Sequence, residues 1–199
     1  MNKSQIVQVV TSDNLYLQGF FAPSQRKTAV LHIHGFEGNF YENKFAQVLA
    51  DKLENGNITF LTVNTRGSGK IKTVGARYEL LEEANEDIDA WINFLAKNGY
   101  DNIILQGHSL GTYKAVRYFL TGRNKNLVKK LILLAPFDKK GMLKVAGYAP
   151  IDKLLNKAQR IVAAGKGDEM ITDEFDSIVV SYKTYMSWYK QDDLGRIVE

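Results

Sequence analysis

The chain has 199 residues, of which 45% are hydrophobic and 24% charged, a composition typical of one globular domain and not of a disordered chain. Its net charge of +4 comes from 26 basic and 22 acidic side chains scattered along the sequence, so we expect no nucleic-acid-binding face. It has no cysteine, which excludes disulfides, a thiolate nucleophile and cysteine-based metal sites and fits the cytoplasm.

The N-terminal residues show no secretion signal, because Ser12-Asp13-Asn14 interrupts them before a long apolar run develops. No uncharged run approaches the roughly 20 residues that a membrane span needs. The two segments flanking Ser12-Asp13-Asn14, residues 4–11 and 15–21, read as strands of an antiparallel hairpin. We therefore expect a cytoplasmic protein that does not bind a membrane.

Strands and helices alternate after this hairpin. Asn39 and Glu42 have the spacing of a capping box, which predicts the start of the first helix. Strands that are apolar throughout and are separated by amphipathic helices predict a parallel sheet with helices on both faces. The predicted strands cover residues 28–34, 58–64, 102–106 and 128–134, and the predicted helices cover residues 41–55, 82–97 and 112–120.

The pattern changes after Pro136, where two helices are predicted at residues 153–164 and 176–189. Two helices in place of a strand indicate a helical cap inserted over the sheet. The alternative is that they only pack against the core, because a stripe of aromatic residues is more often core than pocket. We expect an α/β core at residues 1–137, and in 138–199 the cap insertion together with a truncated end of the core.

A Gly-x-Ser-x-Gly pentapeptide, residues 107–111, joins a predicted strand to a predicted helix. On such a tight turn Ser109 takes a strained backbone angle that points its hydroxyl away from the sheet, and small neighbours relieve the crowding. The helix N-terminus then directs free N–H groups at an oxyanion beside the serine. Ser109 is the predicted nucleophile; the alternative is an ordinary βα turn with a capping serine.

A second segment, His34-Gly35-Phe36, follows the early strand at residues 28–34. A His-Gly segment at this place matches the loop that supplies the second oxyanion-hole N–H in serine hydrolases. The expected donors are the backbone N–H groups of Phe36 and Leu110. The alternative is a glycine-rich loop without a ligand.

These segments resemble the α/β hydrolases, and more narrowly small serine hydrolases of the siderophore-esterase-like and feruloyl-esterase-like kind. The resemblance implies hydrolysis of a small-molecule carboxylic ester through an acyl-enzyme at Ser109, without metal or organic cofactor. It extends over about residues 15–137. The matching pieces are His34-Gly35-Phe36, Asn64-Thr65-Arg66-Gly67, Asp87-Ile88-Asp89-Ala90, residues 107–111 and Leu133-Leu134-Ala135-Pro136.

The sequence departs from this family in its catalytic triad, which runs in chain order serine, acid, histidine. None of the three histidines, His32, His34 and His108, lies after Ser109. We therefore expect an incomplete triad and missing C-terminal strands. Asp138 is a candidate acid, with a capping or loop aspartate as the alternative. Two other functions stay open: an inactive or truncated ligand-binding protein, and a peptidase or amidase.

Three side chains near these motifs are expected to have structural roles. His34 should brace the oxyanion loop, His32 should pack in the core, and Arg66 should anchor its loop. If the C-terminal strands are missing, the strand at residues 128–134 becomes an exposed sheet edge with unpaired backbone groups. Such an edge predicts self-association.

Overall fold

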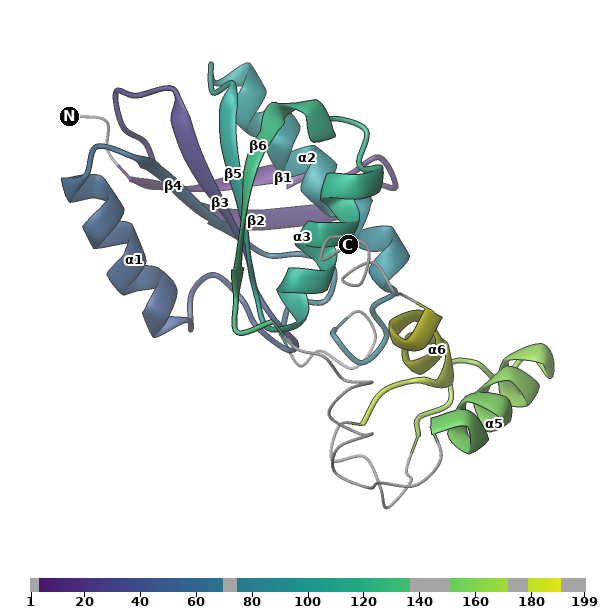
Figure 1. The fold of residues 1–199 in the computed structure, drawn as a ribbon. Helices are drawn as coiled ribbons and strands as arrows, with labels where there is room; N and C mark the ends of the chain where they lie inside the picture. The colour runs from purple at the N-terminus through teal and green to yellow at the C-terminus, as the bar shows by residue number, and fades with distance from the viewer. Residues whose placement is uncertain (1–3, 70–74, 137–150, 172–178, 191–199) are drawn as a thin grey trace.

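The computed structural model describes residues 4–69, 75–136, 151–171 and 179–190, and its centre is a six-stranded sheet (Figure 1). The strand order is β1-β2-β4-β3-β5-β6. The first two strands form the predicted antiparallel hairpin, and β4, β3, β5 and β6 run parallel. The strands are β1 (Gln5–Val10), β2 (Tyr16–Ala22), β3 (Thr28–Ile33), β4 (Thr59–Val63), β5 (Asn102–His108) and β6 (Val128–Leu134).

Helices cover both faces of the sheet, as the alternating pattern predicted (Figure 1). The helix α1 (Lys44–Asn55) packs on the face to which Val30 and Phe60 point. The helices α2 (Ala84–Lys97) and α3 (Leu110–Thr121) pack on the other face, against Leu31 and Leu61. Neighbouring residues of one strand point to opposite faces, and nearly every residue of β3 and β4 is buried, so both strands are covered on both sides.

Two helices lie at the end of the sheet where the parallel strands terminate (Figure 1). They are α5 (Ile151–Ala163) and α6 (Tyr182–Lys190), and both correspond to predicted helices. They share a second hydrophobic cluster with η1 (Leu81–Glu83), the short 3₁₀ helix that precedes α2. A further 3₁₀ turn, η2 (Lys125–Leu127), precedes β6.

Two predicted helix starts are wrong. The first helix begins at Lys44, because Asn43 Oδ1 accepts a hydrogen bond from the N–H of Ala46 at 3.3 Å. Asn39 and Glu42 close a turn before it, with the Asn39 amide donating to the Glu42 carboxylate at 2.6 Å. The last helix begins at Tyr182 and not at residue 176; residues 172–178 lie outside the described residues.

Candidate active site

Backbone strain gathers at the end of the sheet where the parallel strands terminate. Glu37, Ser109 and Ala135 are non-glycine residues with positive φ, and they follow β3, β5 and β6. The carboxyl ends of parallel strands meet at one edge, which is where open α/β sheets bind ligands. Residues held in rarely populated backbone conformations often mark functional sites.

Ser109 has the geometry of a nucleophile elbow. Its φ is 53° and its ψ is −123°, and it lies between the last residue of β5 and the first residue of α3. The turn is tight enough that a Cβ on Gly107 would collide with the carbonyl of Gly111. The Ser109 N–H donates to the carbonyl of Leu134 at 3.0 Å, which ties the elbow to the end of β6.

The loop after β3 lies against this elbow. A Cβ on Gly35 would come within 2.9 Å of the Ser109 Cβ, so only glycine fits there without a shift. A cavity of about 350 Å³ opens between the loop and the elbow, and its lining includes Phe36, His108 and Ser109. Leu110 is the first residue of α3, so its N–H has no partner within the helix. The structure thus brings the predicted nucleophile and both predicted donors to one place.

No histidine of the chain acts on Ser109 in this arrangement. His108 turns its ring toward α1, where it stacks on Phe45 with ring centroids 6.2 Å apart. Burial and, to a smaller extent, the nearby Lys114 ammonium lower the pKa of His34 to about 3. Within the described residues, the hydroxyl of Ser109 makes no hydrogen bond to a side chain. The candidate acid Asp138 lies outside the described residues.

His32 and Arg66 have the structural roles predicted for them. His32 is fully buried, and its Nδ1 lies 2.9 Å from the side-chain oxygen of Gln106. Arg66 binds the buried carboxylate of Asp87 with two guanidinium nitrogens, and its backbone N–H donates to the same carboxylate at 2.8 Å. Burial raises the pKa of Asp87 to about 6, although Arg66 acts in the opposite direction.

The sequence reasoning missed a buried ion pair under the site. Lys114 Nζ lies 2.6 Å from Glu79 Oε1, and both side chains are fully buried. The only signal was position, because Lys114 is four residues from both Leu110 and Tyr118 on the buried face of α3. The lysine also donates to the Thr65 hydroxyl at 3.0 Å, which connects α3 to the loop after β4.

The two predicted oxyanion residues, Phe36 and Leu110, share a hydrophobic cluster with α5 and α6. The Phe36 ring meets the Trp188 ring edge to face, with centroids 5.3 Å apart. Arg77 connects the loop after β3 to the residue before α6. Its guanidinium pairs with Glu37 at 3.3 Å, and its carbonyl accepts from the Ser181 N–H at 2.9 Å.

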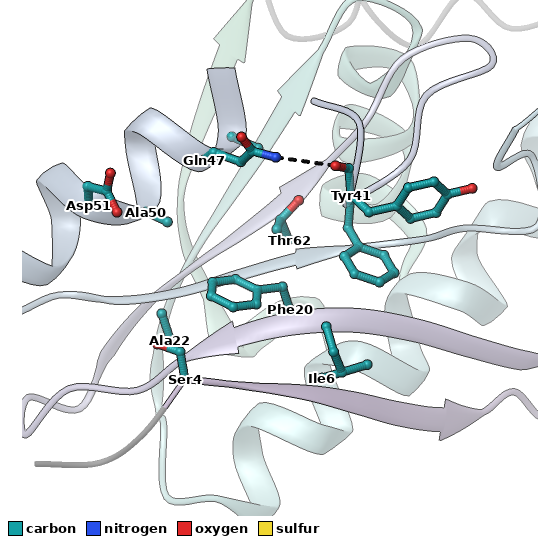
Figure 2. A pocket seen from close by; sticks show the side chains of 11 residues that line it. Ser4, Ile6, Phe20, Ala22, Tyr41, Gln47, Ala50, Asp51 and Thr62 are labelled. Carbon is teal, nitrogen blue, oxygen red and sulfur yellow. Dashed lines mark hydrogen bonds between the residues drawn. The ribbon is translucent and has the colours of Figure 1, made fainter. Parts of the chain in front are cut away.

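A second cavity of about 450 Å³ lies between α1 and the β1, β2 and β4 strands (Figure 2). Ile6 and Phe20 point into it, and Gln47 closes one side by donating to the Tyr41 carbonyl at 3.2 Å (Figure 2). It shares no lining residue with the cavity beside Ser109. This second cavity is therefore separate from the space beside Ser109 in which a substrate would bind.

The described part of the chain has neither a cluster of metal ligands nor a membrane-spanning helix. It contains no group of three or more histidine or acidic side chains that could hold a metal ion. None of its helices is both long enough and apolar enough to cross a membrane.

Known proteins share this architecture. The α/β hydrolase GrgF from Penicillium sp. sh18 is 17% identical, with a TM-score of 0.69 over 97% of this chain and 75% of that one. The Pyrococcus furiosus esterase Pf2001 is 18% identical, with a TM-score of 0.58 over 81% of this chain. An α/β-hydrolase-fold protein of unknown function is 18% identical, with a TM-score of 0.71 over 94% of this chain and 62% of that one.

These low identities show the fold alone, and this chain spans only 59% of the Pyrococcus esterase. No curated protein matches the sequence. Residues 24–195 match the model of a hydrolase family described as serine aminopeptidase, S33. Because this match covers most of the chain, the protein belongs to that family of α/β hydrolases.

Proposed function

We propose that the protein is a serine hydrolase that acts on carboxylic esters, with Ser109 as its nucleophile. The observation that carries this proposal is the backbone of Ser109, with φ 53° and ψ −123° on a strand-to-helix turn beside a cavity. A serine held at that angle costs roughly 1–3 kcal/mol of folding stability, so a function is the best reason for it. A plain capping serine would not need the strain.

In the proposed reaction the Ser109 oxygen attacks the carbonyl carbon of the ester, and the negative charge moves to the carbonyl oxygen. The N–H groups of Phe36 and Leu110 would hold that oxyanion, and each such donor typically contributes roughly 100-fold or more in rate. The tetrahedral intermediate collapses to an acyl-enzyme and releases the alcohol. Water then attacks the acyl carbon and releases the acid and the free serine.

Turnover also needs a base that takes the Ser109 proton. We propose that this base and its acid partner come from outside the described arrangement, either from a longer form of the protein or from a second subunit. By itself the 199-residue chain should then be a slow catalyst, keeping roughly 10³–10⁴-fold acceleration over water from binding and the oxyanion hole. Hydrolysis of a p-nitrophenyl ester at ordinary esterase rates by this chain alone would contradict the missing base.

We also propose that residues 138–199 contain a cap that closes over residues 1–137 and shapes the room for a small acyl substrate. Two observations support this: Phe36 and Leu110 share a hydrophobic cluster with α5 and α6, and the Phe36 ring contacts Trp188 of α6. A closed cap limits the access of bulk water to the bound substrate. The absence of cysteine in the chain supports a cytoplasmic location.

A second candidate is hydrolysis of an amide or peptide bond by the same groups. It is favoured by one finding, the description of the matching family as serine aminopeptidase. Parallel assays of a p-nitrophenyl ester and of an aminoacyl p-nitroanilide decide between the two. Faster turnover of the anilide, lost in Ser109→Ala, would replace the ester proposal.

The nucleophile is tested by labelling with a fluorophosphonate probe and mapping the modified residue. We expect the probe at Ser109 and complete loss of labelling in Ser109→Ala. The matched control is Ser12→Ala, which removes an exposed hydroxyl in the hairpin turn and should label like the wild type. Labelling that persists in Ser109→Ala would refute the assignment. A folded wild type that is never labelled would favour an inactive ligand-binding protein.

A further inference from the structure

The imidazole of His34 is buried under the loop after β3, and both of its nitrogens have partners. Its Nδ1 lies 2.7 Å from the carbonyl oxygen of Gly35, and its Nε2 lies 2.8 Å from the Ser68 hydroxyl. The loop closes over the ring, since a Cβ on Gly38 would come within 3.0 Å of Nδ1. The side chain therefore has little freedom to turn.

The neighbours of this ring decide which nitrogen carries the proton. A backbone carbonyl can only accept, so the Gly35 carbonyl 2.7 Å from Nδ1 requires a proton on Nδ1 of the neutral ring. Nε2 is then an acceptor, and the Thr65 N–H approaches it to 3.2 Å while also lying 3.0 Å from the Ser68 hydroxyl oxygen. The ring stays neutral because burial, together with the nearby Lys114 ammonium, holds its pKa near 3. Nδ1–H then donates to the Gly35 carbonyl.

The hydrogen bond to the Gly35 carbonyl also orients the backbone N–H of the next residue, Phe36. The Gly35 carbonyl and the Phe36 N–H belong to the same planar trans peptide, so they point in opposite directions. Whatever fixes the carbonyl also fixes the N–H. The N–H of Gly38 holds the same carbonyl at 3.2 Å, and the position of Gly35 against Ser109 leaves the peptide little room.

We propose that His34 is a positioning residue, which holds the Gly35 carbonyl with its Nδ1–H and thereby turns the Phe36 N–H toward the oxyanion that forms at Ser109. This inference rests on the proposed function of Ser109. His34 does not touch the reacting atoms. Without this hydrogen bond only the Gly38 N–H holds the carbonyl, so the peptide is less firmly oriented and the Phe36 N–H is a poorer donor to the oxyanion.

The kinetic test compares two replacements that differ in where they place a donor. The amide nitrogen of His34→Asn reaches the position of Nδ1, whereas that of His34→Gln reaches the position of Nε2. We expect the rate constant of fluorophosphonate labelling at Ser109 to fall roughly 100-fold in His34→Gln, as for a lost oxyanion donor. In His34→Asn the loss should stay within about fivefold, which would be a rescue by the conservative variant.

The matched control is His32→Gln, which replaces another buried histidine two residues earlier in the chain, within β3, where its ring contacts Gln106. It should lower stability to a similar extent and leave the labelling rate within about threefold of the wild type. Equal slowing in both His34 variants would overturn the proposal, because it would mean that the ring only fills space. Wild-type labelling in His34→Gln would overturn it too, and would leave Ser109 as the nucleophile.

Nitrogen-15 spectra of the histidine rings test the inference without any reaction. We expect His34 to show a protonated Nδ1 and an unprotonated Nε2, unchanged between pH 7 and pH 5. A proton on Nε2, or titration of the ring in that range, would overturn the proposal even if Ser109 were never labelled. If wild-type Ser109 is not labelled, the proposed function fails and the spectra alone decide the tautomer.

Discussion

The strain at Ser109 predicts that the nucleophile lowers the stability of the protein. At φ 53° and ψ −123°, a residue with a Cβ costs roughly 1–3 kcal/mol, whereas glycine takes this conformation freely. Glycine loses about 0.5–1 kcal/mol more conformational entropy on folding than alanine does. The difference leaves Ser109→Gly more stable than Ser109→Ala by about 1 kcal/mol.

Urea unfolding of the two variants at pH 7 measures this difference, and neither variant has a nucleophile that could complicate the comparison. In a protein of this size 1 kcal/mol corresponds to about 2–4 °C in Tm. Lys52, an exposed residue inside α1, serves as the control. There Lys52→Gly should be less stable than Lys52→Ala by about 1 kcal/mol. If Ser109→Ala proved as stable as Ser109→Gly, the backbone would not be strained and the elbow would lose its main support.

Three further predictions concern stability and association. The pKa values of His32 and His34 are lowered to about 4 and about 3, so below pH 6.5 the unfolded chain binds protons that the folded protein does not. The free energy of unfolding should therefore fall by about 2 kcal/mol per histidine between pH 7 and pH 5. In urea titrations His34→Asn should remove the contribution of one histidine to this fall. Lys114→Met leaves the Glu79 carboxylate buried without its cation and should lower the free energy of unfolding by about 3–5 kcal/mol. The double variant Lys114→Met with Glu79→Leu should recover most of that loss. Equal losses in the single and the double variant would contradict a charge effect. In the described sheet β6 pairs only with β5, so we expect light scattering to show self-association of the wild type. Ile132→Lys, in β6, should reduce it. A monodisperse wild-type monomer would refute the exposed edge.

Much of the fold was predictable from local sequence signals. Apolar runs separated by amphipathic helices predicted the parallel strands, because strands buried on both faces have no polar side. The pentapeptide around Ser109 predicted the elbow, since only a turn with glycines at positions 107 and 111 brings the backbone so close. These features depend on neighbours within a few residues, which is the range that sequence patterns report.

Helix starts were less predictable, because several side chains compete to cap one helix. Asn39 and Asn43 both precede α1, and each accepts hydrogen bonds from backbone N–H groups. The spacing to Glu42 favoured Asn39. In the structure Asn43 accepts from the Ala46 N–H at the start of α1, and sequence spacing alone does not distinguish the two asparagines.

Only the tertiary structure decided how the candidate site is held together. Lys114 and Glu79 are 35 positions apart, and the sequence around each of them does not predict a buried ion pair. The same holds for the His34 ring, whose Nε2 contacts Thr65 and Ser68 from the next loop. The contact of Phe36 with Trp188 joins the loop after β3 to α6. Hydrogen bonds and packing between distant segments form only when the chain is folded, so local pattern carries no record of them.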